Sequence, residues 1–535
     1  MEPTTGNERT GSVAILLPRA EPIAPERGAA PRLSSLEGRA IGIIRNSFPS
    51  AHIILAEIAR LLPATATTHV VDRDYWRPLE PADLAALGAR SDAVIGGIGH
   101  TPPSSSFAIH EAAVLERAGT PTVTLVADRY ERLAQVSADG ERVHGLSLVA
   151  LPYPLEGRAE DELRSLAREA VTAVSQALTA VPDDRPGNAP RGAARVELPD
   201  AIDAVGEFLH AEGYTDGLPV IPPTEERVGR VIELMGRAAE EVVAIIPPRQ
   251  AAATVEAIAV CSVMAGCRPE HVPLVAAAVA AFGEPAFNGR AVQVTSNPAS
   301  VLVVVNGPVR RRLDIATEAD CMGIGTRASV AIGRAVRLVL MNVGGGGAGI
   351  DMACHGFPGK RSFCFGENEE ESPWEPLHVE RGLAPSRDAV TLFPAQGTAN
   401  IAVHGVRPDD VVTALARGMI QPGANNYTVG GEPLLVLNPG HARILGDAGI
   451  SKATLRERLF EEARVPLAWY SAAARSVKRL ESRAIGDSIP VADGPDRIAI
   501  VVAGAPGTHS TFVPTFGHAV SVTRPIDTPS PASGA

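Results

Sequence analysis

The sequence contains little cysteine, few aromatic residues and no long apolar run. Of its 535 residues, 5 are cysteines and 4% are aromatic. No two cysteines form a C-x-x-C pair, which argues against a disulfide scaffold and a structural zinc site. No run approaches the roughly 20 apolar residues that span a bilayer, and the N-terminus lacks the basic-then-apolar order of a signal peptide. We therefore expect a cytoplasmic protein with no membrane partner.

A surplus of basic charge is also missing. The formal net charge is −12, with acidic and basic residues interspersed, so no basic face is available to neutralise the phosphates of a nucleic acid. Hydrophobic residues make up 45% of the chain, which is typical of globular proteins. We expect a small-molecule ligand, no nucleic-acid partner and a homo-oligomer, most commonly a homodimer.

Composition divides the chain into two α/β domains. In the first domain, short apolar runs alternate with helical periodicity, which predicts a Rossmann-like parallel sheet with helices on its faces. A stretch rich in Pro and Gly separates it from a larger α/β domain. The expected limits are a flexible arm at 1–34, the first domain at 35–180, a linker at 181–197, the larger domain at 198–520 and a flexible tail at 521–535.

The larger domain contains a possible internal duplication. Residues 301–310 and 433–443 both read as an apolar strand, an Asn, a Gly/Pro turn and an Arg. If they are related halves, their strand-end loops would face one cleft. The alternative is that a strand followed by a common turn recurs by chance. Further strands are expected at 336–343 and 498–503.

Three segments of the first domain carry a family resemblance: Ile43–Ala51, Ala93–Gly99 and Ile109–Thr122. Through them the chain resembles the UGSC-like family, which is named for a selenocysteine or cysteine followed by Gly-Ser-Cys. In that family the motif follows a strand that ends in Gly-x-Gly. The resemblance implies thiol or selenol redox chemistry at a strand-to-helix turn, which lowers the pKa of such groups.

The chain departs from the family at the motif itself. Thr101 and Ser104 stand where the two chalcogen residues are expected, and no cysteine precedes Cys261. We therefore expect the first domain to be a binding or docking unit. The alternative is a site that uses serine and histidine, for which a base must activate the serine.

The larger domain resembles the segment that is often fused to this domain in longer family members. The motifs that carry the resemblance are 215–224, 263–271, 356–360 and 367–378. These motifs imply a family relationship but no known reaction.

Residues 351–370 form the densest polar segment of the chain. Cys364, Glu367, Glu369 and His355 are the candidate catalytic residues, because they offer a nucleophile and general acid or base groups. The alternatives are an inert buried cysteine, a solvated charge run and a histidine that only satisfies loop backbone.

Polar residues in loops are the candidate substrate-binding groups, since an Arg at a strand end can hold a carboxylate in a bidentate manner. Each has an alternative reading as a turn or surface residue. They are Asn306, Arg310, Lys360, Asn438, His441, Arg443, His509, Asp216 and Ser104.

Cofactors are less clearly indicated. Asp351 and His355 are weak candidate metal ligands, and with Cys364 and Glu367 they match no established zinc spacing. The loop Gly344–Gly349 satisfies a dinucleotide fingerprint on paper, but a fingerprint needs a helix that begins at the loop. A metal ion is therefore possible, and NAD is not expected.

These patterns favour an enzyme of small-molecule metabolism, of the lyase or oxidoreductase class. It would act on a sulfur-containing or carboxylated substrate by thiol and carboxylate acid–base chemistry in the larger domain. Two alternatives stay open: a metal-dependent lyase or hydrolase, and a non-catalytic ligand-binding or regulatory protein.

Overall fold

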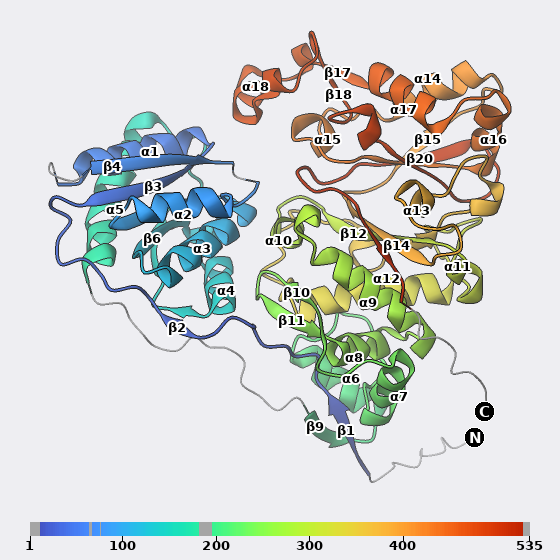
Figure 1. Cartoon of the computed structure of the whole chain (residues 1–535), viewed down its shortest axis with the longest axis horizontal. Coiled ribbons are helices and arrows are strands. Elements are labelled where there is room, and N and C mark those ends of the chain that lie inside the picture. The colour runs from blue at the N-terminus through green and yellow to red at the C-terminus, as the bar shows by residue number, and fades with distance from the viewer. Residues whose placement is uncertain (1–10, 64–66, 75, 181–194, 528–535) are drawn as a thin grey trace, which may run out of the picture.

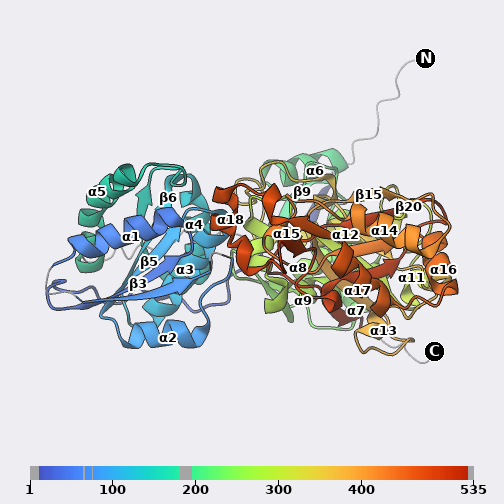
Figure 2. The same cartoon turned by 90° about the horizontal axis from the view of Figure 1, so that it is seen from above.

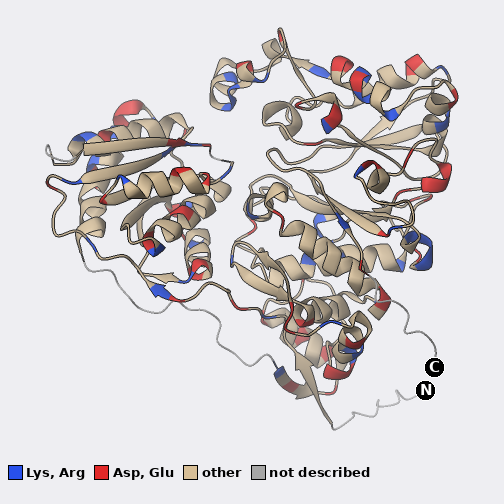
Figure 3. Cartoon of the chain, viewed as in Figure 1, with Lys and Arg blue, Asp and Glu red and all other residues tan. Residues whose placement is uncertain are grey.

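A computed structural model describes residues 11–63, 67–74, 76–180 and 195–527. Figure 1 shows an N-terminal unit and a larger C-terminal unit beside it. Most of the expected linker lies outside the described residues. Figure 3 shows acidic and basic residues interspersed along both units. No helix among the described residues has the length and apolar character needed to cross a membrane.

The N-terminal unit is built on a five-stranded parallel sheet, as the alternating pattern predicts. Its strand order is β4-β3-β5-β6-β8. The strands are β3 (Ala40–Asn46), β4 (Thr67–Arg73), β5 (Ala93–Gly99), β6 (Thr122–Ala127) and β8 (Ser147–Leu151).

Helices cover both faces of this sheet, because successive strand residues point to opposite faces. Ile43 packs in one cluster with residues of α1 (Pro49–Leu61) and α5 (Glu160–Thr179), and Ile44 packs in another with residues of α2 (Pro81–Ala89) and α3 (Pro102–Arg117). Figure 2 shows α1 and α2 on opposite sides of the sheet. The remaining helix of this unit, α4 (Glu131–Glu141), packs beside α3.

Parts of the two segments that were expected to be flexible, 1–34 and 521–535, form strands. Strand β1 (Ser12–Leu16) pairs antiparallel with β9 (Arg195–Pro199), and Ile15 is fully buried and forms a bridge with Thr224 of the C-terminal unit. Strand β21 (Val522–Pro525) forms the edge of a sheet in the same unit. Apolar burial and strand pairing order these two strands.

The C-terminal unit has four layers, helix, sheet, sheet and helix, because its central strands are buried on both faces. On β12 (Ser300–Asn306), Val303 faces the lower helices and Val304 faces the second sheet. On β16 (Leu434–Leu437), Val436 faces the first sheet and Leu437 faces the outer helices. The lower helices include α8 (Val255–Ala265), α9 (Val272–Phe282) and α12 (Arg327–Asn342), and the outer ones include α14 (Pro408–Gly418), α16 (Pro439–Asp447) and α17 (Lys452–Glu462).

The two sheets repeat one pairing pattern, which supports the interpretation of two related halves. Strand β12 is parallel to β13 (Cys364–Gly366) and antiparallel to β14 (Ala389–Ala395). Likewise, β16 is parallel to β19 (Ala499–Val502) and antiparallel to β20 (His509–Val513).

The halves also exchange their edge strands. Strand β15 (Ala399–Ala402) follows β14 in sequence but pairs with β20, and β21 follows β20 but pairs with β14. At the crossover, the Gln396 amide donates to the Pro514 carbonyl at 2.8 Å, and the Phe516 amide donates to the Pro394 carbonyl at 2.7 Å.

One expected strand is a helix. Residues 336–343 belong mostly to α12, which begins after Thr326, whose side chain accepts a hydrogen bond from the Ser329 amide. Buried residues at Ala328, Ile332 and Ala335 show the spacing of a helix face, and this spacing outweighs the strand propensity of the local Val and Leu residues. The glycine-rich loop therefore follows a helix, unlike the loop of a dinucleotide site.

Candidate functional site

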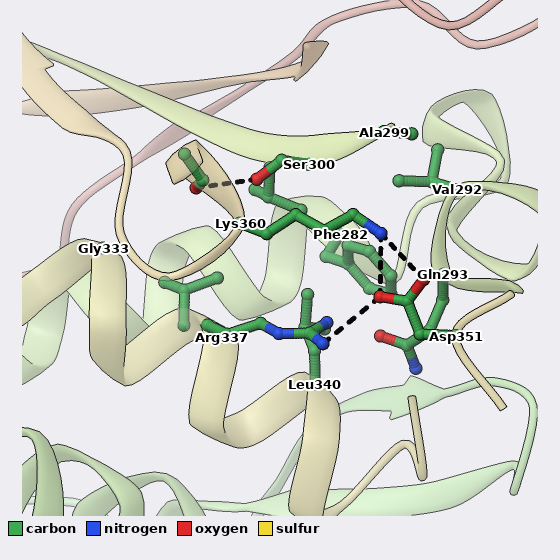
Figure 4. A pocket seen from close by; sticks show the side chains of 13 residues that line it. Phe282, Val292, Gln293, Ala299, Ser300, Gly333, Arg337, Leu340, Asp351 and Lys360 are labelled. Atoms are coloured by element: carbon green, nitrogen blue, oxygen red, sulfur yellow. Dashed lines mark hydrogen bonds and ion pairs between the residues drawn. The ribbon is translucent and has the colours of Figure 1, made fainter. Parts of the chain in front are cut away.

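A small pocket lies where α9, α12 and the start of β12 meet the loop after α12 (Figure 4). Its free volume is about 20 Å³, which is room for about one water molecule. The charged side chains in it are Lys360, Asp351 and Arg337, and Gln293 and Ser300 are also polar. Its apolar walls are formed by Phe282, Val292, Ala299, Val301, Val336 and Leu340.

Two cationic side chains share one carboxylate in this pocket. The Lys360 Nζ atom lies 2.7 and 2.8 Å from the two carboxylate oxygens of Asp351. The Arg337 Nη2 atom donates to Asp351 Oδ2 at 3.3 Å. Figure 4 shows all three side chains converging from different segments. Since only one negative charge faces two positive ones, the site carries an excess of positive charge.

Partial burial makes this excess charge costly. Loss of hydration lowers the pKa of Lys360, although Asp351 opposes the shift. Loss of hydration also lowers the pKa of Arg337. Asp351 is the one hydrogen-bond partner of Arg337 among the described residues, so most of its five N–H donors stay available. Such a site favours a small anion with a planar carboxylate.

The glycine-rich loop brings Asp351 to this position. A Cβ atom on Gly344 or Gly346 would lie within 2.5 Å of the Gln293 side chain, so only glycine lets the backbone pack this closely. Gln293 lies on α10 (Gly289–Val294), donates to the Pro247 carbonyl, and has an Oε1 atom without a hydrogen-bond partner. The loop thus folds back over α12 and places Asp351 beside Arg337.

The N-terminal unit contacts the same loop. Leu133 of α4 packs in one apolar cluster with Ile350 and Val294 of the C-terminal unit, and Met352 packs against that cluster. The guanidinium of Arg132 lies beside Gly349. Helix α4 therefore supports the residues on both sides of Asp351.

Four of the candidate residues meet in a second cluster, at the other end of β12. The Asn306 amide donates to Glu367 at 2.6 Å and to Glu369 at 3.0 Å. Arg310 lies 2.8 Å from Glu369. Ser300 lines the pocket, so Asn306, six residues along the strand, is about 20 Å away from it.

This second cluster is closed to solvent at its centre. Glu367 is fully buried, and burial raises the pKa of its carboxyl, although Lys452, 3.9 Å away, opposes the shift. Its Oε2 atom also accepts from the Leu377 amide at 2.8 Å. Glu367 thereby holds the loop 367–377 in place and does not face an open pocket.

A third cluster contains the second-half candidates. His441 Nδ1 lies 2.7 Å from Asn438 Nδ2 and 2.8 Å from Ser510 Oγ, and burial lowers the pKa of His441. His509 is exposed beside Asn400. The polar groups of Asn438, His441 and Ser510 are hydrogen-bonded to one another, which is typical of a structural network.

The remaining candidates lie apart from the pocket. Arg443 pairs with Glu371, and Asp216 pairs with Arg334 on α12. Ser104 forms a capping box with Thr101 at the start of α3. His355 is exposed.

Cys364 is buried on β13, and burial raises the pKa of its thiol far above the usual range. This environment disfavours a thiolate nucleophile. Within the described ranges, no group of three or more His, Cys, Asp or Glu side chains is arranged to hold a metal ion. Asp351, a weak candidate metal ligand, is instead engaged by Lys360 and Arg337.

Sequence reasoning missed Arg337. It lies in the run Val336-Arg-Leu-Val-Leu-Met341, which reads as a buried strand when the charge is passed over. A charged residue inside an apolar run is the signal that identifies it, because such residues are seldom buried without a partner.

Comparisons with known proteins bear on the N-terminal unit. Residues 14–180 match the sequence model of the UGSC family, so this unit carries a UGSC-like domain. No curated protein matches the chain significantly. Among solved structures, Smu.1420 from Streptococcus mutans UA159 is similar at 14% identity and a TM-score of 0.20, over 26% of this chain and 99% of that one. A likeness this low supports no further conclusion.

Proposed function

We propose that the C-terminal unit is an enzyme that binds a small carboxylate-bearing metabolite in the pocket of Lys360, Arg337 and Asp351. The observation that carries this proposal is the pair of cations sharing one carboxylate beneath apolar walls. A carboxylate satisfies the guanidinium and ammonium donors, and a short aliphatic chain suits the walls.

Ligand entry requires Asp351 to move, because the free space is about 20 Å³. The ligand carboxylate would take the position of the Asp351 carboxylate between Lys360 and Arg337. Without ligand, the Asp351 carboxylate thus occupies the position proposed for the ligand carboxylate. The glycine-rich loop has the conformational freedom that this exchange of carboxylates requires.

Lys360 is the acid–base group of the proposed reaction. Asp351 is the side chain that opposes the lowering of the Lys360 pKa by burial. A ligand carboxylate in the place of Asp351 would oppose the shift in the same way, so burial and the charge of nearby Arg337, which both lower the pKa of Lys360, are what favour the neutral amine. A neutral lysine beside a bound carboxylate can accept a proton from the adjacent carbon. This chemistry uses no thiol.

Calorimetric titration of the whole chain with a panel of two- to five-carbon carboxylates tests the binding step. We expect saturable binding that Arg337→Met and Lys360→Met each weaken by about tenfold or more, the loss of one charge-assisted interaction. Arg327→Met is the matched control, since Arg327 is exposed at the start of the same helix. Binding that survives both pocket variants would contradict the proposal.

Turnover separates an enzyme from a binding protein. For a carboxylate that binds, we expect proton exchange or product formation that Lys360→Arg abolishes while binding persists. The guanidinium of arginine keeps the charge but does not release its proton. Binding without any turnover in the unaltered protein would instead identify a ligand-binding module.

A further inference from the structure

The carboxyl edge of the N-terminal sheet brings together polar side chains from three neighbouring strands. Asn46 ends β3, Arg73 ends β4 as its cross-strand neighbour, and His100 follows β5. The chain runs from β3 outward to β4 and then back across to β5. The carboxyl edge between β3 and β5 is therefore the topological switch point, where open α/β sheets bind ligands.

Arg73 is buried there without hydrogen bonds. Its side chain is 0% exposed, and among the described residues its one close charged partner is Glu111, 3.3 Å away. None of its three guanidinium nitrogens has a hydrogen-bond partner within the described residues. The Oε2 atom of Glu111 is an acceptor 3.3 Å from Nη1. Within the described residues no acceptor serves Nε or Nη2, and buried donors are rarely left unsatisfied, so these two nitrogens indicate an acceptor from a ligand.

His100 presents an acceptor with the same deficit. Its Nδ1 atom lies 3.0 Å from the Ile98 carbonyl oxygen and 3.3 Å from Asn46 Nδ2. We assign the proton to Nδ1, because the nearer carbonyl oxygen can only accept, and this tautomer leaves Nε2 with a lone pair. The Nε2 atom is buried and also lacks a hydrogen-bond partner. Burial lowers the pKa of His100 to about 4, and the charge of nearby Arg73 acts in the same direction. The imidazole is therefore neutral at pH 7.

The backbone is shaped around this spot. A Cβ atom on Gly97 of β5 would lie 2.7 Å from the Ile44 carbonyl oxygen and 3.5 Å from Arg73 Nη2. The Ile44 carbonyl therefore requires glycine at position 97, and the guanidinium of Arg73 lies within ordinary contact distance of the same point. Helix α3 begins directly after His100, with Thr101 as its N-cap, and its amide dipoles add positive potential.

We propose that this edge of the sheet, between Arg73 and His100, binds a small oxyanion that carries one hydroxyl group, such as hydrogenphosphate, bicarbonate or a hydroxy acid. The charged oxygens accept hydrogen bonds from the guanidinium of Arg73, and the hydroxyl group donates to Nε2 of His100. Because the site has both unpartnered donors and an unpartnered acceptor, it favours an anion that carries a hydroxyl group over an anion without one. The site lies in the other unit from the carboxylate pocket and does not depend on the proposed function.

The C-terminal unit contacts the N-terminal unit close to the end of β4. The Asn288 amide of that unit donates to the Trp76 carbonyl at 3.2 Å, and the Trp76 ring packs edge-on against Phe516 at 6.4 Å. Trp76 follows Arg73 by three residues. Pro102 and Ser104 at the start of α3 are buried as well, so the proposed site lies in the interior of the protein.

Titration of the whole chain with inorganic phosphate, followed by calorimetry at neutral pH, tests the site. Sulfate is the matched probe, because it has the same shape and no hydroxyl proton at that pH. We expect phosphate to bind at least about tenfold more tightly than sulfate, the effect of one buried hydrogen bond. The Lys360→Met variant should bind phosphate as the unaltered protein does, which separates this site from the carboxylate pocket.

Two variants remove the site in different ways. His100→Phe deletes the acceptor and keeps the ring, and Arg73→Met with Glu111→Gln removes the ion pair as a whole, so that no lone charge stays buried. Each should weaken phosphate binding by about tenfold or more, with Arg45→Met, a half-buried residue of β3 paired with Asp72, unchanged. If the double variant fails to fold, His100→Phe decides alone. No saturable phosphate binding, equal sulfate binding or binding unaffected by His100→Phe would overturn the proposal.

Discussion

Arg290 of the C-terminal unit and Glu141 of the N-terminal unit form an ion pair 3.0 Å long, with side chains only 10% and 3% exposed. Arg290 also donates to the Ser106 hydroxyl at 3.1 Å. Glu141 further contacts His110 and Arg117 within its own unit. A pair this deeply buried ties the UGSC-like domain to the C-terminal unit that holds the carboxylate pocket.

Breaking this pair should destabilise the protein. We expect Arg290→Met to lower the free energy of unfolding by about 3 kcal/mol, at the low end for a buried pair because His110 and Arg117 still face Glu141. Chemical denaturation measures the loss. Arg311→Met, which removes a guanidinium that is 72% exposed, should change stability by less than about 1 kcal/mol. Equal effects of the two variants would contradict a buried junction.

The same carboxylate predicts a pH dependence. Burial alone raises the pKa of Glu141, but the His110 hydrogen bond and the charges of Arg290 and Arg117 lower it to about 2, from 4.5. A depressed pKa stabilises the folded state above pH 4.5, and this stabilisation is lost as the pH falls toward 2. We expect the unfolding free energy to fall by about 3 kcal/mol over that window, as measured by denaturation at each pH. Glu141→Gln should flatten this part of the profile.

Support of the Asp351 loop by α4 can be tested in the same protein. Leu133→Ala removes apolar contacts with Ile350, so we expect faster amide hydrogen exchange in residues 344–354. Leu163→Ala is the control, since Leu163 is equally buried but belongs to α5. Exchange in this loop that responds equally to both variants would show that α4 has no special role.

Thiol labelling distinguishes the buried cysteine from an exposed one. Cys354 is exposed and Cys364 is buried, where a raised pKa disfavours the thiolate. With iodoacetamide at neutral pH, we expect rapid modification of Cys354 and protection of Cys364 until the protein unfolds. Peptide mass analysis over time gives both rates. Comparable rates in the folded protein would restore Cys364 as a candidate nucleophile.

Much of the fold follows from local pattern. The expected strands at 301–305 and 434–437 appear as β12 and β16 because each is a short apolar run bounded by turn residues. The recurrence of strand, Asn and turn also pointed to the repeated pairing of the two sheets. The strand expected at 336–343 was wrong, because an apolar segment with β-branched residues fits a buried strand and a buried helix equally well.

The sites depended more on tertiary structure. Asn306 and Glu367 were both candidates, yet their contact joins residues 61 apart in sequence, and only the fold shows that it is closed to solvent. Asp351 and Lys360 were candidates for different roles and form one ion pair.

Local pattern was enough to predict the α/β class and several central strands, among them β12, β16 and β19, because hydrophobic periodicity is a local property. It also placed charged and polar residues in the loops where sites form. The tertiary structure alone decided which of these residues share a pocket, since burial and charge pairing depend on segments that only packing brings together. Arg337 is an example, because its role in the pocket depends on its hydrogen bond to Asp351, which belongs to a separate loop.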